Sequence, residues 1–90
     1  MMKQPLNCAI LKLFKSLDEA CYADVMDKLK AEYGDMRAFT RKGVDGVLMT
    51  AVTNGILEET RYELDKNGDL KIFYRANDEG KATIEKYLPH

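Results

Sequence analysis

The 90-residue sequence predicts a single α+β domain (residues 1–90), mainly helical, in which three helices precede a β-hairpin and a short last helix. Three observations support this prediction. Apolar side chains recur at helical spacing in three early segments, Asn67-Gly68 marks a tight turn between two strand-like runs, and a last helical pattern follows the second run. A chain of this length can bury only one modest core.

The first two helices are predicted from apolar stripes. The first stripe consists of Leu6, Ile10, Leu13, Phe14 and Leu17. The second consists of Tyr22, Val25, Met26, Leu29 and Tyr33. We expect a brief extended segment at residues 20–22 between the two helices, and we expect Gly34 to end the second helix in the left-handed conformation.

The third helix is predicted to begin after Thr40, whose side chain is suited to cap it, with Phe39 packing on Val44 as a hydrophobic staple. Its buried stripe is expected to be Val44, Val47, Leu48, Ala51 and Val52, and Asn54 with Gly55 is expected to end it. Gly43 and Gly46 each cost about 1 kcal/mol relative to alanine within a helix. They indicate either close approach of a binding partner or a partner helix, or tight packing inside the domain.

The hairpin has its best register with a three-residue loop of Lys66, Asn67 and Gly68, in which Gly68 takes the left-handed position of a bulged turn. One face then pairs Leu64 with Leu70, Tyr62 with Ile72, and Thr60 with Tyr74. The other face places Glu63 opposite Lys71 and Glu59 opposite Arg75, each pair contributing roughly 0.2–1 kcal/mol. We therefore expect Tyr62 and Tyr74 to face the core.

The last helix is expected to be capped by Asn77 or Asp78 and to end before Pro89. Its apolar contacts would come from Ala82, Ile84, Tyr87 and Leu88.

The composition favours a binding protein over an enzyme. Fourteen basic and fifteen acidic side chains give a net charge of −1, which provides no long-range attraction to a polyanion. The only histidine is the final residue, His90, and there is no CxxC, HExxH or glycine-rich phosphate loop. We therefore expect no catalytic activity, no cofactor and no metal.

The cysteines and the N-terminal region favour a cytoplasmic location. Cys8 and Cys21 are expected to be inert, partly buried thiols, and a metal or oxidation sensor is the less favoured alternative. Polar residues such as Asn7 and Lys12 interrupt the apolar stretch after Pro5, unlike a signal peptide or a membrane span.

Two stretches resemble winged helix-turn-helix transcription regulators, most of all the PadR-type group, with MarR-like and other winged helices as close rivals. Residues 44–57 are similar to the family's recognition helix and its exit through Gly55-Ile56-Leu57, and residues 74–81 resemble its strand-to-helix junction, where threonine usually stands in place of Asn77. The resemblance covers Pro5 to Leu88. It implies sequence-dependent binding of duplex DNA as a homodimer, with the third helix in the major groove and the hairpin, or wing, near the backbone or minor groove.

The resemblance also implies a set of DNA-binding residues. The reading surface would comprise Arg41, Lys42, Asp45, Met49 and Thr50, with Lys66 and Asn67 at the tip of the wing. Arg37, Thr40, Arg41 and Lys42 would lie near phosphates, and Asp45 and Met49 would face bases. The sequence departs from the family here, because Asp45, Gly46, Met49 and Thr50 occupy positions where Tyr, Arg or Lys is frequent.

The small number of basic residues on the predicted reading surface has two consequences. Each phosphate contact contributes about 0.9 to the salt slope, so three or four basic groups per subunit bind duplex DNA weakly unless two subunits act together. The alternative function is a winged helix that contacts protein, in which Met49, Thr50 and Thr53 meet another protein or a second copy of the chain.

Overall fold

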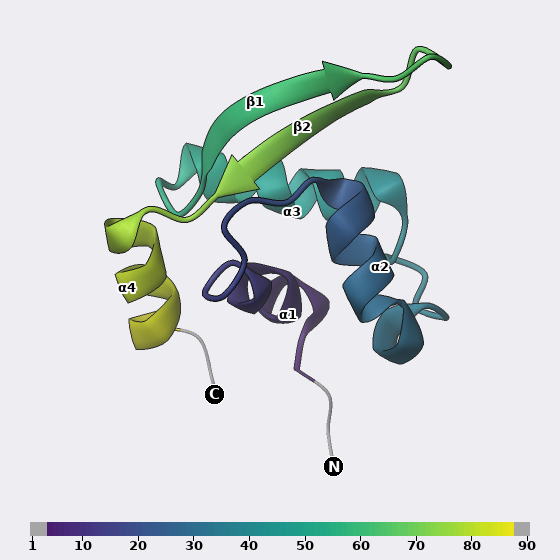
Figure 1. Cartoon of the computed structure of the whole chain (residues 1–90). Coiled ribbons are helices and arrows are strands. Elements are labelled where there is room, and N and C mark those ends of the chain that lie inside the picture. The colour runs from purple at the N-terminus through teal and green to yellow at the C-terminus, as the bar shows by residue number, and fades with distance from the viewer. Residues whose placement is uncertain (1–3, 88–90) are drawn as a thin grey trace.

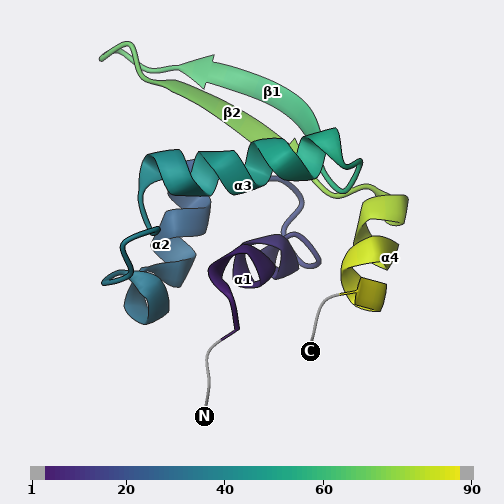
Figure 2. The ribbon, with the colours of Figure 1, turned by 180° about the vertical axis from the view of Figure 1, so that it is seen from behind.

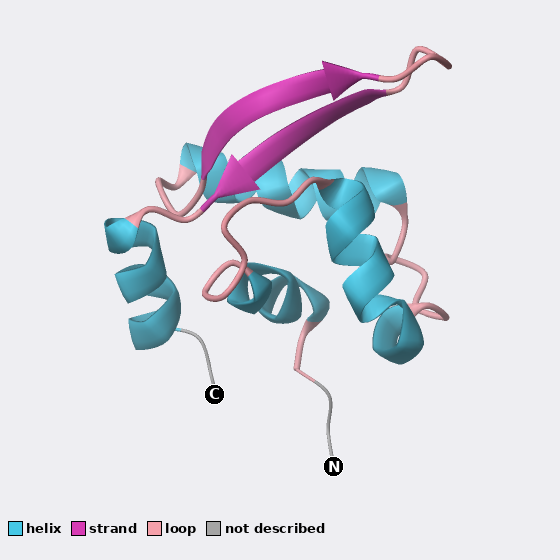
Figure 3. Ribbon diagram, viewed as in Figure 1, coloured by secondary structure: helices cyan, strands magenta, loops and turns pink. Residues whose placement is uncertain are grey.

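The computed structural model describes residues 4–87 and shows three helices, a hairpin and a last helix in the predicted order (Figure 1). The elements are α1 (Leu6–Leu13), α2 (Tyr22–Tyr33), α3 (Arg41–Thr53), β1 (Glu58–Leu64), β2 (Leu70–Arg75) and α4 (Asp78–Tyr87). The two strands form one antiparallel sheet, which projects beyond the helices at its turn (Figure 3). None of the helices within the described residues has the length and apolarity that crossing a membrane requires.

The core lies between the helices and the base of the hairpin. Its largest fully buried side chains are Tyr33, Tyr74, Phe14, Ile10, Leu48, Ile84, Val25 and Val44. The predicted stripes of the first three helices therefore supply the core, although α1 ends four residues earlier than its stripe suggests. The amides of Phe14, Lys15 and Ser16 bond to carbonyls three residues back, so the helix tightens into a turn and Leu17 packs from outside it.

The predicted extended segment between α1 and α2 is confirmed at Ala20. Its amide and carbonyl bond to the carbonyl and amide of Tyr74, at 3.0 and 2.9 Å, which adds a short bridge to the free edge of β2. Cys21 is also extended, and α2 starts at Tyr22.

The predicted caps are confirmed at two helix starts, and the expected conformation is wrong at Gly34. Thr40 caps α3, because its Oγ1 accepts a hydrogen bond from the amide of Gly43 at 3.0 Å, and the Oδ1 of Asn77 accepts from the amide of Gly80 at 2.8 Å. Gly34 has a φ of −59°, in the right-handed region. A Cβ there would lie 2.5 Å from the carbonyl oxygen of Lys30, so close packing against the helix requires the glycine.

The predicted register is confirmed in the half of the hairpin nearest the turn. Leu64 pairs with Leu70, Tyr62 with Ile72, and Glu63 with Lys71. Gly68 has a φ of +81° and its amide donates to the carbonyl of Asp65 at 2.9 Å, which is the expected bulged turn.

At the base of the hairpin the predicted register is wrong. The regular pairing is interrupted between Glu59 and Arg61, so that Glu59 pairs with Tyr74 and Glu58 with Arg75. Thr60 is the extra residue of this bulge, and its hydroxyl donates to Glu19 at 2.7 Å, across the sheet. A bulge changes the twist and orientation of a strand, which ends the simple alternation of faces assumed from the sequence.

Two predicted core positions are also wrong. Tyr62 is 74% exposed although it shares its side of the hairpin with Ile72, because it borders a hollow that leaves its ring open to solvent. Ala82 is exposed, and Ile84 supplies the buried apolar contact of α4. Leu88, Pro89, His90 and the side chain of Tyr87 lie outside the described residues.

Candidate nucleic-acid interface

The outer side of α3 is open to solvent. Val44, Leu48 and Ala51 bury one side of this helix, while Lys42, Gly46, Met49 and Thr50 are exposed. Viewed from behind, α3 runs across the molecule between α2 and α4, with the hairpin above it (Figure 2). A helix and a projecting two-stranded ribbon are therefore presented together.

The predicted site residues fall into three groups. Arg37 lies in the exposed loop before α3, and Lys66 and Asn67 lie at the exposed tip of the hairpin. The others belong to α3 or its cap: Thr40, Arg41, Lys42, Asp45, Met49 and Thr50. Only part of the last group lines one hollow, which is formed by Arg41, Lys42, Asp45, Gly46 and Met49. Thr50 lies in a separate hollow between α3 and α1, together with Asn7 and Leu11.

The two α3 glycines have different surroundings. A Cβ at Gly43 would lie 2.2 Å from the carbonyl oxygen of Ala38, so tight packing inside the domain explains this glycine. A Cβ at Gly46 would meet no atom within 4 Å. Gly46 thus leaves the helix backbone open to an approaching molecule.

The basic side chains near α3 are not equivalent. Arg41 forms an ion pair with Asp69, donates to the carbonyl of Leu70 at 2.8 Å, and lies 3.5 Å from a carboxylate oxygen of Asp45. Arg37, Lys42 and Lys66 form no ion pair within residues 4–87. The charges open to a phosphate are therefore those three, with Arg41 engaged by the hairpin.

Arg61 and Arg75 on the strands form ion pairs as well, but with other partners than the sequence suggested, and Lys71 forms none within residues 4–87. Glu63 lies opposite Lys71 in the sheet but forms its ion pair with Arg61 on its own strand. Arg75 pairs with Glu58 at 3.2 Å, because the bulge moves Glu59 away from it.

Arg61 also anchors the outer face of the hairpin base. Its Nε donates to Glu19 at 2.7 Å, and its guanidinium lies 3.9 Å from the centre of the Phe73 ring. Hydrogen bonds from Thr60 and then Arg61 lower the pKa of Glu19 below its ordinary value. The base of the hairpin is therefore held by charge as well as by the burial of Tyr74.

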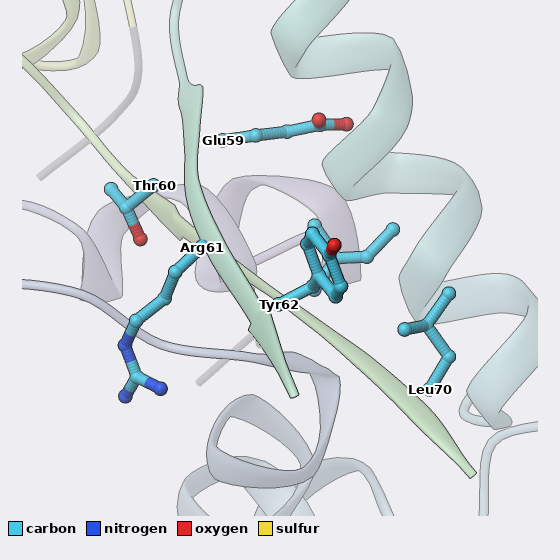
Figure 4. Close-up of a pocket in the computed structure, with 6 residues that line it drawn as sticks. Glu59, Thr60, Arg61, Tyr62 and Leu70 are labelled. Atoms are coloured by element: carbon cyan, nitrogen blue, oxygen red, sulfur yellow. The ribbon is translucent and has the colours of Figure 1, made fainter. Parts of the chain in front are cut away.

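Sequence reasoning missed an apolar surface on the far half of the hairpin. Tyr62 is 74% exposed, Leu64 67% and Leu70 44%, and Met49 on α3 is 59% exposed. Tyr62 and Leu70 point from the same side of the hairpin toward α3, whereas Thr60 and Arg61 point away from it (Figure 4). The hollow there, of about 410 Å³, is also lined by Glu59 and Ile72.

The cysteines form no visible site. Both are free thiols, with Cys21 buried at the start of α2 and Cys8 half-buried in α1. Among residues 4–87, no group of three or more His, Cys, Asp or Glu side chains is arranged to hold a metal ion.

The fold was compared with those of known proteins. It matches PadR of Bacillus subtilis, solved in complex with operator DNA, with a TM-score of 0.71 at 22% sequence identity. The match covers 94% of this chain and 48% of the PadR chain, so the chain spans about half the length of that protein. No protein-family model and no curated protein sequence matches the chain. The order of elements and this match show that the chain has the winged helix-turn-helix fold of PadR, a transcription regulator, as its sequence predicts.

Proposed function

We propose that this protein is a small transcriptional regulator that binds duplex DNA with α3 and the wing. One observation carries the proposal: among residues 4–87 nothing covers the outer side of α3, which lies next to a projecting hairpin in the fold of a protein solved with operator DNA. A helix of this kind fits the major groove, whose base edges carry a distinct pattern for each base pair.

The exposed residues in and before α3 can be assigned to phosphates or to bases by their chemistry. Arg37 and Lys42 supply charge for phosphates at the start of α3, where the helix dipole also favours an anion. Gly46 lets the helix backbone come close to bases, and Met49 offers an apolar contact for a thymine methyl group. Thr40 contributes by fixing the start of the helix through its cap.

The number of basic side chains that can contact phosphates limits the affinity of one subunit, and this bears on how many subunits bind one DNA site. Arg37, Lys42 and Lys66 give a salt slope of roughly 2–3 per subunit at about 0.9 for each phosphate contact. Such a slope corresponds to weak binding, so we propose that two copies bind one DNA site. The DNA site would then have two-fold symmetry.

A titration of labelled mixed-sequence duplex DNA at two salt concentrations tests the proposal. We expect binding at low salt, and we expect the Arg37→Ala, Lys42→Ala double variant to weaken it and to reduce the slope by about 2 per subunit. The matched control is Lys28→Ala, Lys81→Ala, which removes two exposed lysines from α2 and α4. The proposal is wrong if the wild type does not bind at low salt, or if both double variants behave alike.

Light scattering on the free and DNA-bound protein tests the second part. We expect the mass of the complex to correspond to two chains per duplex. One chain per duplex at saturation would contradict the dimer while leaving DNA binding intact.

Contact with protein is the second candidate function, favoured by the exposed apolar surface. Contiguous exposed apolar side chains mark interaction sites more often than chance, and Tyr62, Leu64, Leu70 and Met49 are all large and exposed. In this function the surface formed by the hairpin and α3 contacts a second copy or another protein. Replacement of Tyr62 and Leu64, but not of Arg37 and Lys42, would then abolish the interaction.

A further inference from the structure

Arg41 connects three elements of the fold. It is the first residue of α3, and its Nη1 forms an ion pair with Oδ1 of Asp69, just before β2. Its Nη2 donates to the carbonyl of Leu70 at 2.8 Å, and its guanidinium lies 4.2 Å from the centre of the Tyr22 ring on α2. Its Nε faces Asp45 at 3.5 Å. Each of the three guanidinium nitrogens therefore has an intramolecular partner.

Further hydrogen bonds of Asp69 and its neighbour Asp65 join the same elements. The hydroxyl of Tyr22 donates to Oδ2 of Asp69 at 2.7 Å. The amide of Asp69 donates to the side chain of Asp65 at 2.9 Å, and the amide of Asn67 donates to the same oxygen at 2.9 Å. The hairpin turn is thus tied through Asp69 to the first residues of both α2 and α3.

The ionisation of this cluster agrees with its geometry. The Tyr22 hydroxyl, and then the Arg41 guanidinium, lower the pKa of Asp69 below its ordinary value. The hydrogen bond to Asp69 raises the pKa of Tyr22. The carboxylate is charged and the phenol is neutral throughout the neutral pH range.

Little else holds this part of the hairpin. Tyr62, Leu64 and Leu70 are largely exposed, so apolar burial does not fix the far half of the wing against the helices. A short two-stranded ribbon without such packing is only marginally stable by itself. The polar cluster of Tyr22, Arg41 and Asp69 lies where this packing is missing.

We infer that Arg41 is a positioning residue that holds the wing at a fixed angle to α3, and that it is not itself a phosphate contact. This inference rests on the proposed DNA-binding function. A duplex must meet α3 and the wing at the same time, so a wing that moves relative to α3 must be ordered when DNA binds, and affinity falls.

Replacing Asp69 tests the inference, because the two possible roles of Arg41 predict opposite changes in DNA affinity. If Arg41 contacts phosphate, Asp69→Asn removes a competing negative charge and frees the guanidinium, so DNA binding tightens. If Arg41 positions the wing, the same variant weakens binding. We expect a loss between roughly twofold and 150-fold, the range for members of one coupled network, with the salt slope unchanged. The control is Glu79→Gln, which removes the same charge from an exposed position on α4, away from the cluster and the candidate interface, and does not weaken binding.

Arg41 variants supply a second comparison. Arg41→Lys keeps the charge that a phosphate would need but loses the forked geometry that reaches both Asp69 and Leu70. We therefore expect Arg41→Lys to lose affinity nearly as much as Arg41→Ala. We also expect the Arg41→Ala, Asp69→Ala double variant to be no worse than either single variant. Near-normal binding by Arg41→Lys would overturn the inference.

A readout without DNA separates this inference from the proposed function. Amide hydrogen exchange, followed by NMR in the free protein, should accelerate at residues 65–70 in Asp69→Asn and Arg41→Lys and stay unchanged in Glu79→Gln. If no variant binds DNA but exchange accelerates as expected, the proposed function fails and the positioning role stands. Unchanged exchange at the turn, or tighter DNA binding by Asp69→Asn, overturns the positioning role.

Discussion

The two halves of the hairpin contain similar residues and have opposite surroundings. At the base, Tyr74 is 1% exposed and exchanges backbone hydrogen bonds with Ala20. In the half nearest the turn, Tyr62 is 74% exposed and Leu64 67%. Alternation along a strand therefore indicates which side chains share a side of the sheet, and it does not indicate whether another layer covers that side.

The packing beneath the two halves explains the difference. Tyr74 at the base belongs to the core, whereas Tyr62 and Leu70 border a hollow of about 410 Å³ on the side of the hairpin that faces α3 (Figure 4). The helices therefore cover the base of the ribbon and leave its far half open. The far half must be held by other means, and the cluster of Tyr22, Arg41 and Asp69 lies there.

The largest expected effect on stability is the difference between replacing Tyr74 and replacing Tyr62. Tyr74→Ala removes a fully buried aromatic ring, and we expect it to lower the free energy of unfolding by about 3–5 kcal/mol. Tyr62→Ala removes an exposed ring, and we expect a change within about 0.5 kcal/mol. Denaturant unfolding of both variants measures the difference.

Tyr74→Leu keeps this prediction testable if the alanine variant does not fold. We expect it to be less destabilising than Tyr74→Ala, because it retains much of the buried apolar volume. Equal losses at positions 62 and 74 would contradict the distinction between the two halves.

The sequence was sufficient for features set by local chemistry. The core stripes of α1 to α3, the Thr40 cap, and the register set by Gly68 at the turn are all confirmed. Each depends on residues close together in the chain, where spacing and turn chemistry decide the structure.

Features that depend on contacts between distant residues were not predicted. The bulge at Thr60 is fixed by Glu19, more than forty residues away. Arg41 was assigned to phosphates because a basic residue at the start of a recognition helix suits that role, and nothing in the sequence indicates its partner Asp69. The exposure of Tyr62 was not predictable either, because alternation along a strand shows which side chains share a side and not whether another element covers that side.

Gly43 and Gly46 are a covered and an open position within α3. Gly43→Ala places a methyl group against the backbone of residue 38, and we expect it to destabilise the protein by about 1–3 kcal/mol. Gly46→Ala meets no atom within 4 Å, and we expect it to stabilise the protein by about 0.5–1 kcal/mol through helix propensity. Thermal or denaturant unfolding of the two variants measures both signs.

Gly46→Ala also tests whether the backbone of α3 approaches the bases closely, as the proposed function states. If α3 approaches bases closely at this residue, the added methyl group weakens DNA binding although the protein is more stable. A variant that is stabilised and binds DNA as the wild type does would show that the helix backbone at Gly46 does not approach the duplex.

Replacing two residues of the exposed apolar surface is also expected to have a small effect on stability. Because Tyr62 and Leu64 are covered only by their cross-strand partners, we expect the Tyr62→Thr, Leu64→Thr double variant to lose at most about 1 kcal/mol, since threonine retains high strand propensity. Binding of an apolar dye should fall clearly.

If DNA binding is the function, the Tyr62→Thr, Leu64→Thr variant retains most of its affinity for DNA because the cluster around Arg41 is intact. If contact with a second copy of the chain is the function, the variant loses a concentration-dependent increase in mass, measured by light scattering, that the wild type shows. The same two substitutions, which barely change the fold, therefore distinguish DNA binding from contact between copies through this surface.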